Sequence, residues 1–358
     1  MRDRARSYVA DYAVDLDRFA QEIEEHLEPH VVGYGYAIAA DGQVARQGAG
    51  GARRVPQPGN TLTAPFAFTP TTVNETASTT KTITAVAVMR ELKRKGLSLD
   101  AKVNPYLPVQ WERGPGMTTV TFRQLLAHGG LTKPAGICST DYYGCLEEAV
   151  RLGMTSPPGY DNIHYAIMRV ILPFMHNQQG MRQLFAELPD ETARNLAFSD
   201  DFRDYVVDML ELGGITADTE FPPSRNLAWR YAWGTPPTDE FFPANDEEDF
   251  LHTGPGGFKM SAVEYAQFLA GFEHGRFLSL SAAQELKDDW LGFDDKTLVG
   301  TAAIGPLYTK NGGSGGGASR SMIFPGDVQV FITRNSTGNP AEPDSTEMLR
   351  AAWEDALI

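Results

Sequence analysis

The sequence predicts an α/β protein of the α+β type, in which one antiparallel sheet is built from both ends of the chain and a helical insertion separates its two halves. Strand patterns occur near both termini, whereas residues from about 70 to 240 read as helices with long loops. The 358 residues also exceed the roughly 250–300 at which a single core stops growing. We therefore expect residues 1–70 and 250–358 to form the sheet domain and residues 71–249 to form a mostly helical region.

The N-terminal part begins with a predicted helix over residues 13–28, which ends at Pro29. Its apolar side chains recur at helical spacing and share one face: Leu16, Phe19, Ile23 and Leu27. The following segment, VVGYGYAIAADGQVARQGAG, reads as two strands joined at Asp41-Gly42, a strong hairpin signal. These elements place a helix and a hairpin at the start of the sheet domain.

The C-terminal part predicts a matching arrangement. A helix is expected in SAVEYAQFLAGFEHG, followed by a strand pair, ASRSMIF and VQVFITRN, around Pro325-Gly326-Asp327. The chain closes with a helix near DSTEMLRAAWEDALI. We expect the N- and C-terminal helices to flank the same sheet.

Composition excludes several classes of partner. The formal net charge is -15, which disfavours nucleic acid and anionic membrane surfaces. No apolar run approaches the roughly 18 residues needed to span a bilayer. The N-terminus has no apolar segment after its arginines, so we expect a cytoplasmic protein, or a secreted one if a signal was removed.

Cysteine and histidine usage is uninformative about cofactors. Cys138 and Cys145 lie seven residues apart, a spacing that fits either a disulfide or two free thiols. His26 and His30 have metal-ligand spacing, but no third ligand or catalytic glutamate is arranged with them. We expect neither a metal nor another cofactor.

The stretch ETASTTKTITAVAVMREL, residues 75–92, predicts a buried helix with one charge between Ala77 and Met89, namely Lys81. Residues i and i+3 share a helix face, so Lys81 lies beside Ser78. A helix N-terminus favours developing negative charge, and a lysine in apolar surroundings has a lowered pKa and can deprotonate a serine. The pair therefore indicates nucleophilic catalysis without a Ser-His-Asp triad.

Two later motifs support that interpretation. In PGYDNIHYAIM, the hydroxyl of Tyr160 would be a general base if two ammonium groups favoured its phenolate, and Asn162 could hold a lysine or a substrate amide. The alternative for this motif is a turn with Asn162 as a helix N-cap. In YTKNGGSGGGASRSMIF, Lys310-Asn311-Gly312-Gly313 lies beside the final hairpin, where glycine permits close approach of a substrate. A flexible glycine linker is the alternative here.

The order S-x-x-K, Y-x-N and K-x-G resembles the serine β-lactamase and penicillin-binding-protein superfamily, nearest to class C β-lactamases, related esterases and D-amino-acid peptidases. Further stretches agree, among them FTPTTVNETASTTK, TFRQLLAHGGL and GPGGFKMSAVEYAQFL. The resemblance covers roughly residues 30–335. It implies a β-lactamase/transpeptidase-like fold with its active site at the junction of the two regions.

The resemblance also implies roles for the matched residues. Ser78 is the acylated nucleophile, Lys81 is its partner in proton transfer and Tyr160 is the general base. Asn162 and Lys310 orient the substrate together with Asn311 and Gly312, and the backbone N–H groups of Ser78 and Gly313 form an oxyanion hole. Asn311 departs from the family pattern, which has a hydroxyl residue that grips a substrate carboxylate.

The expected activity is therefore hydrolysis of a small ester, amide or lactam through an acyl-enzyme, as in an esterase, amidase or D-peptidase. The substrate is a small molecule or a short peptide-like acyl compound. Two alternatives use the same site: an acyltransferase or cyclising transpeptidase, and a binding protein that traps an acyl group without turnover. Asn311 favours poor turnover of β-lactams. A scaffolding protein would form no covalent adduct.

Overall fold

The computed structural model describes most of the chain, and all structural statements refer to that part. The described residues are 13–57, 62–134, 143–154, 159–188, 190–217, 226–234, 237–241, 251–299, 304–337, 339–341 and 344–358. Cys138 lies outside them. Cys145 is disulfide-bonded.

One seven-stranded sheet joins the two ends of the chain. Its order is β3-β2-β1-β11-β10-β9-β8, and every neighbouring pair is antiparallel. The strands are β1 (Gly33–Ala40), β2 (Gln43–Arg54), β3 (Phe66–Ala67), β8 (Asp295–Val299), β9 (Gly305–Ser314), β10 (Gly317–Phe324) and β11 (Val328–Arg334). Because β1 pairs with β11, the predicted construction from both termini is confirmed.

Both predicted hairpins are present. Asp41 and Gly42 link β1 to β2 with positive φ at both positions, and Gly326 and Asp327 do the same between β10 and β11. Two consecutive residues with positive φ match the right-handed twist of the flanking strands. The turn residues thus set the register of the sheet on both sides of its centre.

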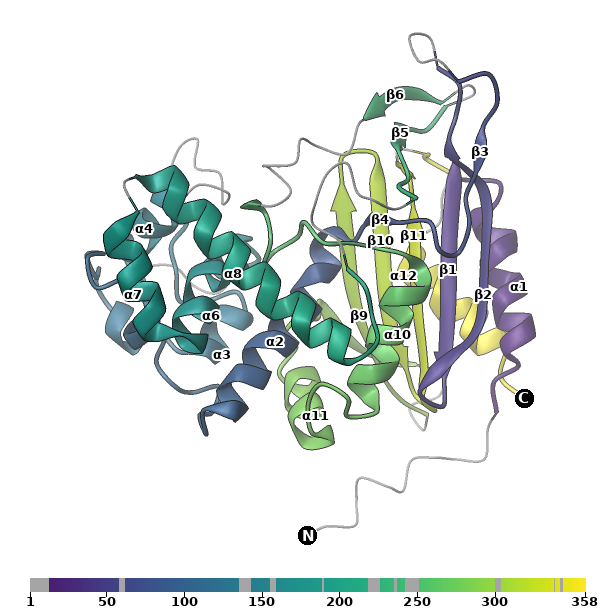
Figure 1. Ribbon diagram of the computed structural model, residues 1–358. Coiled ribbons are helices and arrows are strands. Elements are labelled where there is room, and N and C mark those ends of the chain that lie inside the picture. Colours follow the sequence, from purple (N-terminus) through teal and green to yellow (C-terminus); the bar gives the residue numbers. More distant parts are fainter. Residues whose placement is uncertain are drawn as a thin grey trace.

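The two faces of the sheet bury different helices, as Figure 1 shows. On one face, α1 (Leu16–Leu27) and α12 (Ser345–Asp355) contact each other and share an apolar cluster with Tyr36, Ile38 and Val330. On the other, α10 (Ala262–Glu273) packs over β1 and β11, where Tyr265 stacks on Phe331 with centroids 4.0 Å apart. Alternate residues of a strand face opposite sides, which places neighbouring residues of β1 in two separate cores.

The middle of the chain supplies the helices at the left of Figure 1. They are α2 (Thr80–Arg94), α3 (Phe122–Leu126), α4 (Tyr143–Leu152), α5 (Ile163–Ala166), α6 (Met168–His176), α7 (Gln178–Glu187) and α8 (Glu191–Leu212), with α11 (Leu280–Asp288) following α10. Short 3-10 turns are η1 (Ala77–Thr79), η2 (Asn104–Tyr106) and η3 (Met117–Thr119). α2 contacts α6, α8 and α11, and nearly all its side chains are buried, as its sparse charges predict.

Short strands also occur within and beside this helical region, which the sequence patterns did not predict. β5 (Arg230–Ala232) and β6 (Thr238–Phe241) form a small sheet with β12 (Ser336–Thr337), and β4 (Asn74–Glu75) pairs with β7 (Lys259–Met260). Two to four residues are too few for a recognisable alternation of polar and apolar side chains. Among the described residues, no helix combines the length and apolarity needed to cross a bilayer.

Candidate active site

The chain makes a sharp turn just before α2, and Ser78 lies in it. Ala77 has a φ of 47°, in the left-handed region that alanine rarely adopts, and begins η1. Hydroxyls hold this turn in place: Thr76 Oγ1 donates to Phe258 O at 2.8 Å and Thr79 Oγ1 donates to Thr76 O at 2.6 Å. Ala77 and Thr79 are buried, so Ser78 is the residue of η1 that keeps partial exposure. The prediction placed Ser78 at the start of the helix; the structure places it in the 3-10 turn that leads into α2.

Lys81 lies one turn further on, wholly buried. Its Nζ atom is 2.9 Å from Ser78 Oγ and donates to Pro255 O at 2.8 Å. That carbonyl is presented by a tight turn in which Gly254 has a φ of 110° and approaches Tyr165 O, leaving no room for a side chain. Burial, together with the smaller effect of the nearby Lys310 ammonium, lowers the pKa of Lys81 to about 6.

Tyr160 also contacts Ser78. Its hydroxyl donates to Ser78 Oγ at 2.9 Å, although 57% of the residue's surface is exposed. Lys81 Nζ and Lys310 Nζ lie 5.1 and 4.9 Å from the Tyr160 ring centroid, and the His128 ring packs at 4.4 Å. The predicted nearness of two amino groups is therefore present.

The expected consequence for Tyr160 is wrong in direction. Burial raises the pKa of Tyr160, and the carboxylates of Asp294 and Asp161 raise it further, whereas its hydrogen bond with Ser78 acts in the other direction. Near neutral pH the group is therefore a phenol, not a phenolate. A phenol is a weak base, so another group would have to accept the proton of Ser78.

β9 brings the third motif to the same place, with Lys310, Asn311, Gly312 and Gly313 in sequence along the strand. Lys310 is buried and forms an ion pair with Asp294 Oδ1, and the Asn311 backbone N–H donates to Asp294 Oδ2 at 2.7 Å. Burial lowers the pKa of Lys310, while the Asp294 carboxylate opposes that shift. The motif is part of an ordered strand and not a flexible linker.

Gly312 and Gly313 differ in their surroundings. A Cβ at Gly312 would lie 2.3 Å from Ser319 Oγ and 2.5 Å from Thr76 O, so only glycine lets β9 approach the turn of Ser78 this closely. A Cβ at Gly313 would meet nothing within 4 Å. The space that we assigned to substrate approach therefore lies at Gly313, whereas Gly312 serves close packing.

Asn162 occupies the N-cap position of α5, but its side chain makes no capping hydrogen bond. Its Oδ1 atom is buried and has no hydrogen-bond partner among the described residues. Neither the expected contact with Lys81 nor the alternative capping bond is therefore formed through this oxygen. It remains an acceptor without a partner within the described structure.

A pocket of about 290 Å³ opens beside Tyr160. Its lining residues come from three loops and are Ala127, His128, Gly159, Tyr160, Asp289, Trp290, Phe293 and Asp294. A substrate held there would lie against Tyr160, whose hydroxyl contacts Ser78. The pocket is small and mixes aromatic side chains with two carboxylates.

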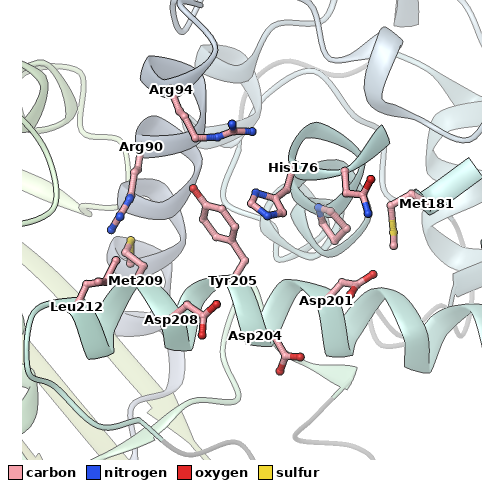
Figure 2. Close-up of a pocket in the computed structure, with 12 residues that line it drawn as sticks. Arg90, Arg94, His176, Met181, Asp201, Asp204, Tyr205, Asp208, Met209 and Leu212 are labelled. Atoms are coloured by element: carbon pink, nitrogen blue, oxygen red, sulfur yellow. The ribbon is translucent and has the colours of Figure 1, made fainter. Parts of the chain in front are cut away.

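A second pocket, of about 350 Å³, lies among α2, α6, α7 and α8 and contains none of the predicted site residues (Figure 2). Arg90 and Arg94 face it from α2, and Asp204 and Asp208 from α8. Arg94 forms an ion pair with the buried Glu91, which also accepts a hydrogen bond from Tyr205. These charges thus serve in part to hold the helices together.

Three contributors escaped the sequence interpretation: His128, Asp294 and the Pro255 carbonyl. No role was predicted for His128, which begins the turn His128-Gly129-Gly130. Its Nδ1 atom is 3.0 Å from Asp161 O, and burial lowers its pKa to about 4, so a neutral ring packs against Tyr160. Asp294 lies in a loop without a recognisable motif. Pro255 lies in GPGGFKMSAVEYAQFL, which resembles the family, but that stretch gave no indication that its carbonyl would contact Lys81.

Comparisons with known proteins bear on the family and the fold. A family model described as Beta-lactamase matches residues 19–357. Among solved structures, D-amino acid amidase from Ochrobactrum anthropi SV3 is 16% identical with a TM-score of 0.66 and covers 95% of this chain and 99% of that one. The β-lactamase/D-alanine carboxypeptidase of Yersinia pestis is also 16% identical, with a TM-score of 0.66 and coverages of 96% and 99%.

A class C β-lactamase from Rhodobacter sphaeroides is 18% identical, with a TM-score of 0.61 and coverages of 94% and 96%. A search of curated protein sequences gives no significant match. At these identities the solved structures bear on the fold, and they agree in it along almost the whole chain.

Proposed function

Because this chain belongs to the β-lactamase family, we propose that it is a serine hydrolase that opens a small ester, amide or lactam through an acyl-enzyme on Ser78. The observation that carries the proposal is the convergence on one oxygen: Lys81 Nζ and Tyr160 OH each lie 2.9 Å from Ser78 Oγ. A serine hydroxyl needs a base within hydrogen-bond reach to become a nucleophile. Here two candidate proton carriers are within that reach.

Lys81 is the base in this proposal, and Tyr160 is the acid. With a pKa of about 6, Lys81 is mostly the neutral amine at pH 7, and its lone pair can accept the Ser78 proton while an N–H remains on Pro255 O. Ser78 Oγ then bonds to the acyl carbon, and Lys81 becomes an ammonium ion. Tyr160, a phenol, donates its proton to the leaving group, and the Lys81 ammonium, 5.1 Å from the Tyr160 ring centroid, returns a proton to the resulting phenolate.

Backbone donors would stabilise the oxyanion that forms on the acyl carbonyl. Ser78 N–H, in the turn before α2, and Gly313 N–H, on β9, are the proposed pair. An oxyanion-hole donor of this kind contributes roughly 10²–10³ in kcat. Asn162 Oδ1, which has no partner in the described structure, would accept a substrate N–H, and Lys310 would hold positive charge beside Tyr160.

Water resolves the acyl-enzyme in a hydrolase, and an amine or alcohol does so in an acyltransferase. The first steps are identical, so the site serves either outcome. Two of the structural neighbours are an amidase and a β-lactamase/carboxypeptidase, which favours hydrolysis of an amide here. An acyl-trapping protein would complete the first step and lack the second.

Hydrolysis of a short-chain p-nitrophenyl ester by the wild type and by Ser78→Ala tests the proposal. We expect steady turnover in the wild type, loss of about 10³-fold or more in Ser78→Ala, and unchanged turnover in Ser281→Ala, which alters an exposed serine of α11. Intact-protein mass spectrometry during turnover should show an acyl adduct of the wild type alone. One stoichiometric burst with a lasting adduct would identify an acyl trap, and near wild-type turnover by Ser78→Ala would exclude the mechanism.

A further inference from the structure

We propose that Asp294 sets the charge selectivity of this pocket, disfavouring acyl substrates that carry a carboxylate and favouring those that carry an ammonium group. The inference rests on the proposed acyl-enzyme function and names the substrate class for it. The inference starts from the ion pair between Lys310 and Asp294. A buried ammonium beside a nucleophilic serine is suited to attract a substrate carboxylate, but here the chain supplies that carboxylate itself.

The position of Asp294 is fixed from two sides. Its backbone N–H donates to Thr309 O at 2.8 Å, which ties the loop before β8 to β9 one residue from Lys310. Its side chain then pairs with Lys310 through Oδ1 and accepts from the Asn311 N–H through Oδ2. The Lys310 side chain is 2% exposed and that of Asp294 is 25% exposed. The carboxylate therefore stands between the ammonium and the open pocket.

The other ionisable groups at the pocket do not restore a positive charge. Asp289 is the second carboxylate of the lining, and it pairs with Arg123, which also contacts Asp100 and Glu285. His128, with a pKa of about 4, is neutral at pH 7, and so for the most part is Lys81, with a pKa of about 6. Tyr160 is a phenol. A substrate in the pocket thus meets the carboxylate of Asp294, and the ammonium group of Lys310 that balances it is buried behind it.

Asp294 also retains hydrogen-bonding capacity. An ionised carboxylate offers about four lone-pair sites, and two are occupied here. An ammonium or amide N–H of a substrate can take an exposed one, with a charge-assisted hydrogen bond in the ammonium case. A substrate carboxylate, in contrast, would face a like charge and would find the Asn311 N–H already used. Asn311 adds no hydroxyl to compensate.

Three alanine p-nitroanilides, which share the same leaving group, test the inference. One has a free amine, one is N-acetylated and one is N-succinylated, and each is used in its D and L forms. In the wild type we expect kcat/KM for the amine to exceed that for the succinyl compound by at least about tenfold. Asp294→Asn removes the charge and keeps an oxygen for the Asn311 N–H. It should reduce that ratio by about tenfold or invert it, because Lys310 is then free to attract the succinyl carboxylate.

The matched control is Asp289→Asn, which removes a carboxylate from the same pocket. The charge of Arg123 remains balanced there by two other acids, so the ratio should change by less than about threefold. An Asp294→Asn ratio equal to that of the wild type, in an enzyme that still hydrolyses the p-nitrophenyl ester, would overturn the inference and leave the proposed function standing. Ester turnover that does not depend on Ser78 would overturn the proposed function instead.

A second measurement uses only the wild type, in case Asp294→Asn does not fold or the anilides are too slow. Butylammonium and butyrate are compared as competitive inhibitors of ester hydrolysis at the same ionic strength. We expect the ammonium ion to bind at least about tenfold more tightly. Equal inhibition, or tighter binding of butyrate, would contradict the assignment of Asp294.

Discussion

Lys81 Nζ lies 2.9 Å from Ser78 Oγ, one helical turn away in sequence and in a position closed to solvent. The short distance matters for catalysis only because Lys81 is buried. A lysine at an exposed helix start would stay charged near neutral pH and could only donate to the serine. Because α2 is buried along nearly its whole length, the amine loses its proton easily and can accept one. Burial thus makes Lys81 a candidate base.

The first prediction concerns pH. Only neutral Lys81 accepts the serine proton, so kcat/KM for an uncharged ester should rise with pH through an apparent pKa of about 6 and level off above it. Stopped initial-rate measurements between pH 4.5 and 9 give the profile. A rise centred near 10 would show that Lys81 stays charged and would make another group the base. His128, with a pKa of about 4, titrates below this window.

The second prediction separates Tyr160 from Lys81. Tyr160→Phe keeps the ring between His128 and the two lysines but removes the hydroxyl that donates to Ser78. We expect a loss of about 10² or more in kcat for an amide, whose leaving group needs a proton, and a smaller loss for a p-nitrophenyl ester, whose leaving group does not.

Equal losses with both substrates would instead make Tyr160 the base that activates Ser78. Lys81→Arg is the complementary variant, because it places a permanent positive charge beside Ser78 and has no amine that titrates near pH 6. It should abolish turnover of both substrates.

A third prediction concerns stability. Between pH 6 and 10.5 the unfolded chain binds a proton at Lys81 that the folded chain does not, so this residue makes stability rise with pH across that window. Lys81→Met removes the effect. We therefore take the free energy of unfolding of Lys81→Met minus that of the wild type. This difference should be largest near pH 6 and should decline steadily toward pH 9.

Urea denaturation of both proteins at four pH values measures that slope, and the comparison does not depend on the constant cost of leaving Pro255 O without a donor. A difference that is flat with pH would mean that Lys81 is protonated in the folded state. Lys93→Met, at an exposed position of the same helix, supplies the control and should show no such slope.

Much of the arrangement was predictable because it rests on local signals. Asp41-Gly42 specified a hairpin, and the single charge between Ala77 and Met89, Lys81, specified the partner of Ser78. Both inferences use spacings of one to three residues, at which backbone geometry alone decides which side chains meet. The joint order of three motifs then predicted which distant segments converge.

The remainder depends on distances that no local pattern encodes. Asp294 reaches Lys310 only because its loop is hydrogen-bonded to β9 at Thr309, a pairing that follows from the whole sheet. The direction of the Tyr160 pKa shift was wrong for a related reason. The hydrogen bond with Ser78 lowers the pKa of Tyr160, but burial and the carboxylates of Asp294 and Asp161 outweigh that effect. The sequence shows which ionisable residues are present, but it does not show how deeply each is buried, and burial decides the direction of the pKa shift.

The last prediction tests the contact between β9 and the nucleophile turn. At Gly312 a methyl group would collide with Ser319 Oγ and with the Thr76 carbonyl, and the second of these belongs to the backbone just before Ser78. Gly312→Ala must therefore push β9 away from η1 or distort the turn, and either change moves Gly313 N–H relative to Ser78. We expect a loss of at least about tenfold in kcat, together with about 1–3 kcal/mol of stability from overpacking.

Gly315→Ala is the matched control, three residues further along the same hairpin, where a methyl group would meet nothing within 4 Å. It should change the ester kcat by less than about twofold and the free energy of unfolding by less than about 1 kcal/mol. Measuring kcat and urea midpoints for both variants distinguishes the two effects. Wild-type kcat in Gly312→Ala would mean that the spacing between β9 and Ser78 is not needed for stabilising the oxyanion, and Gly313 would then lose its proposed role.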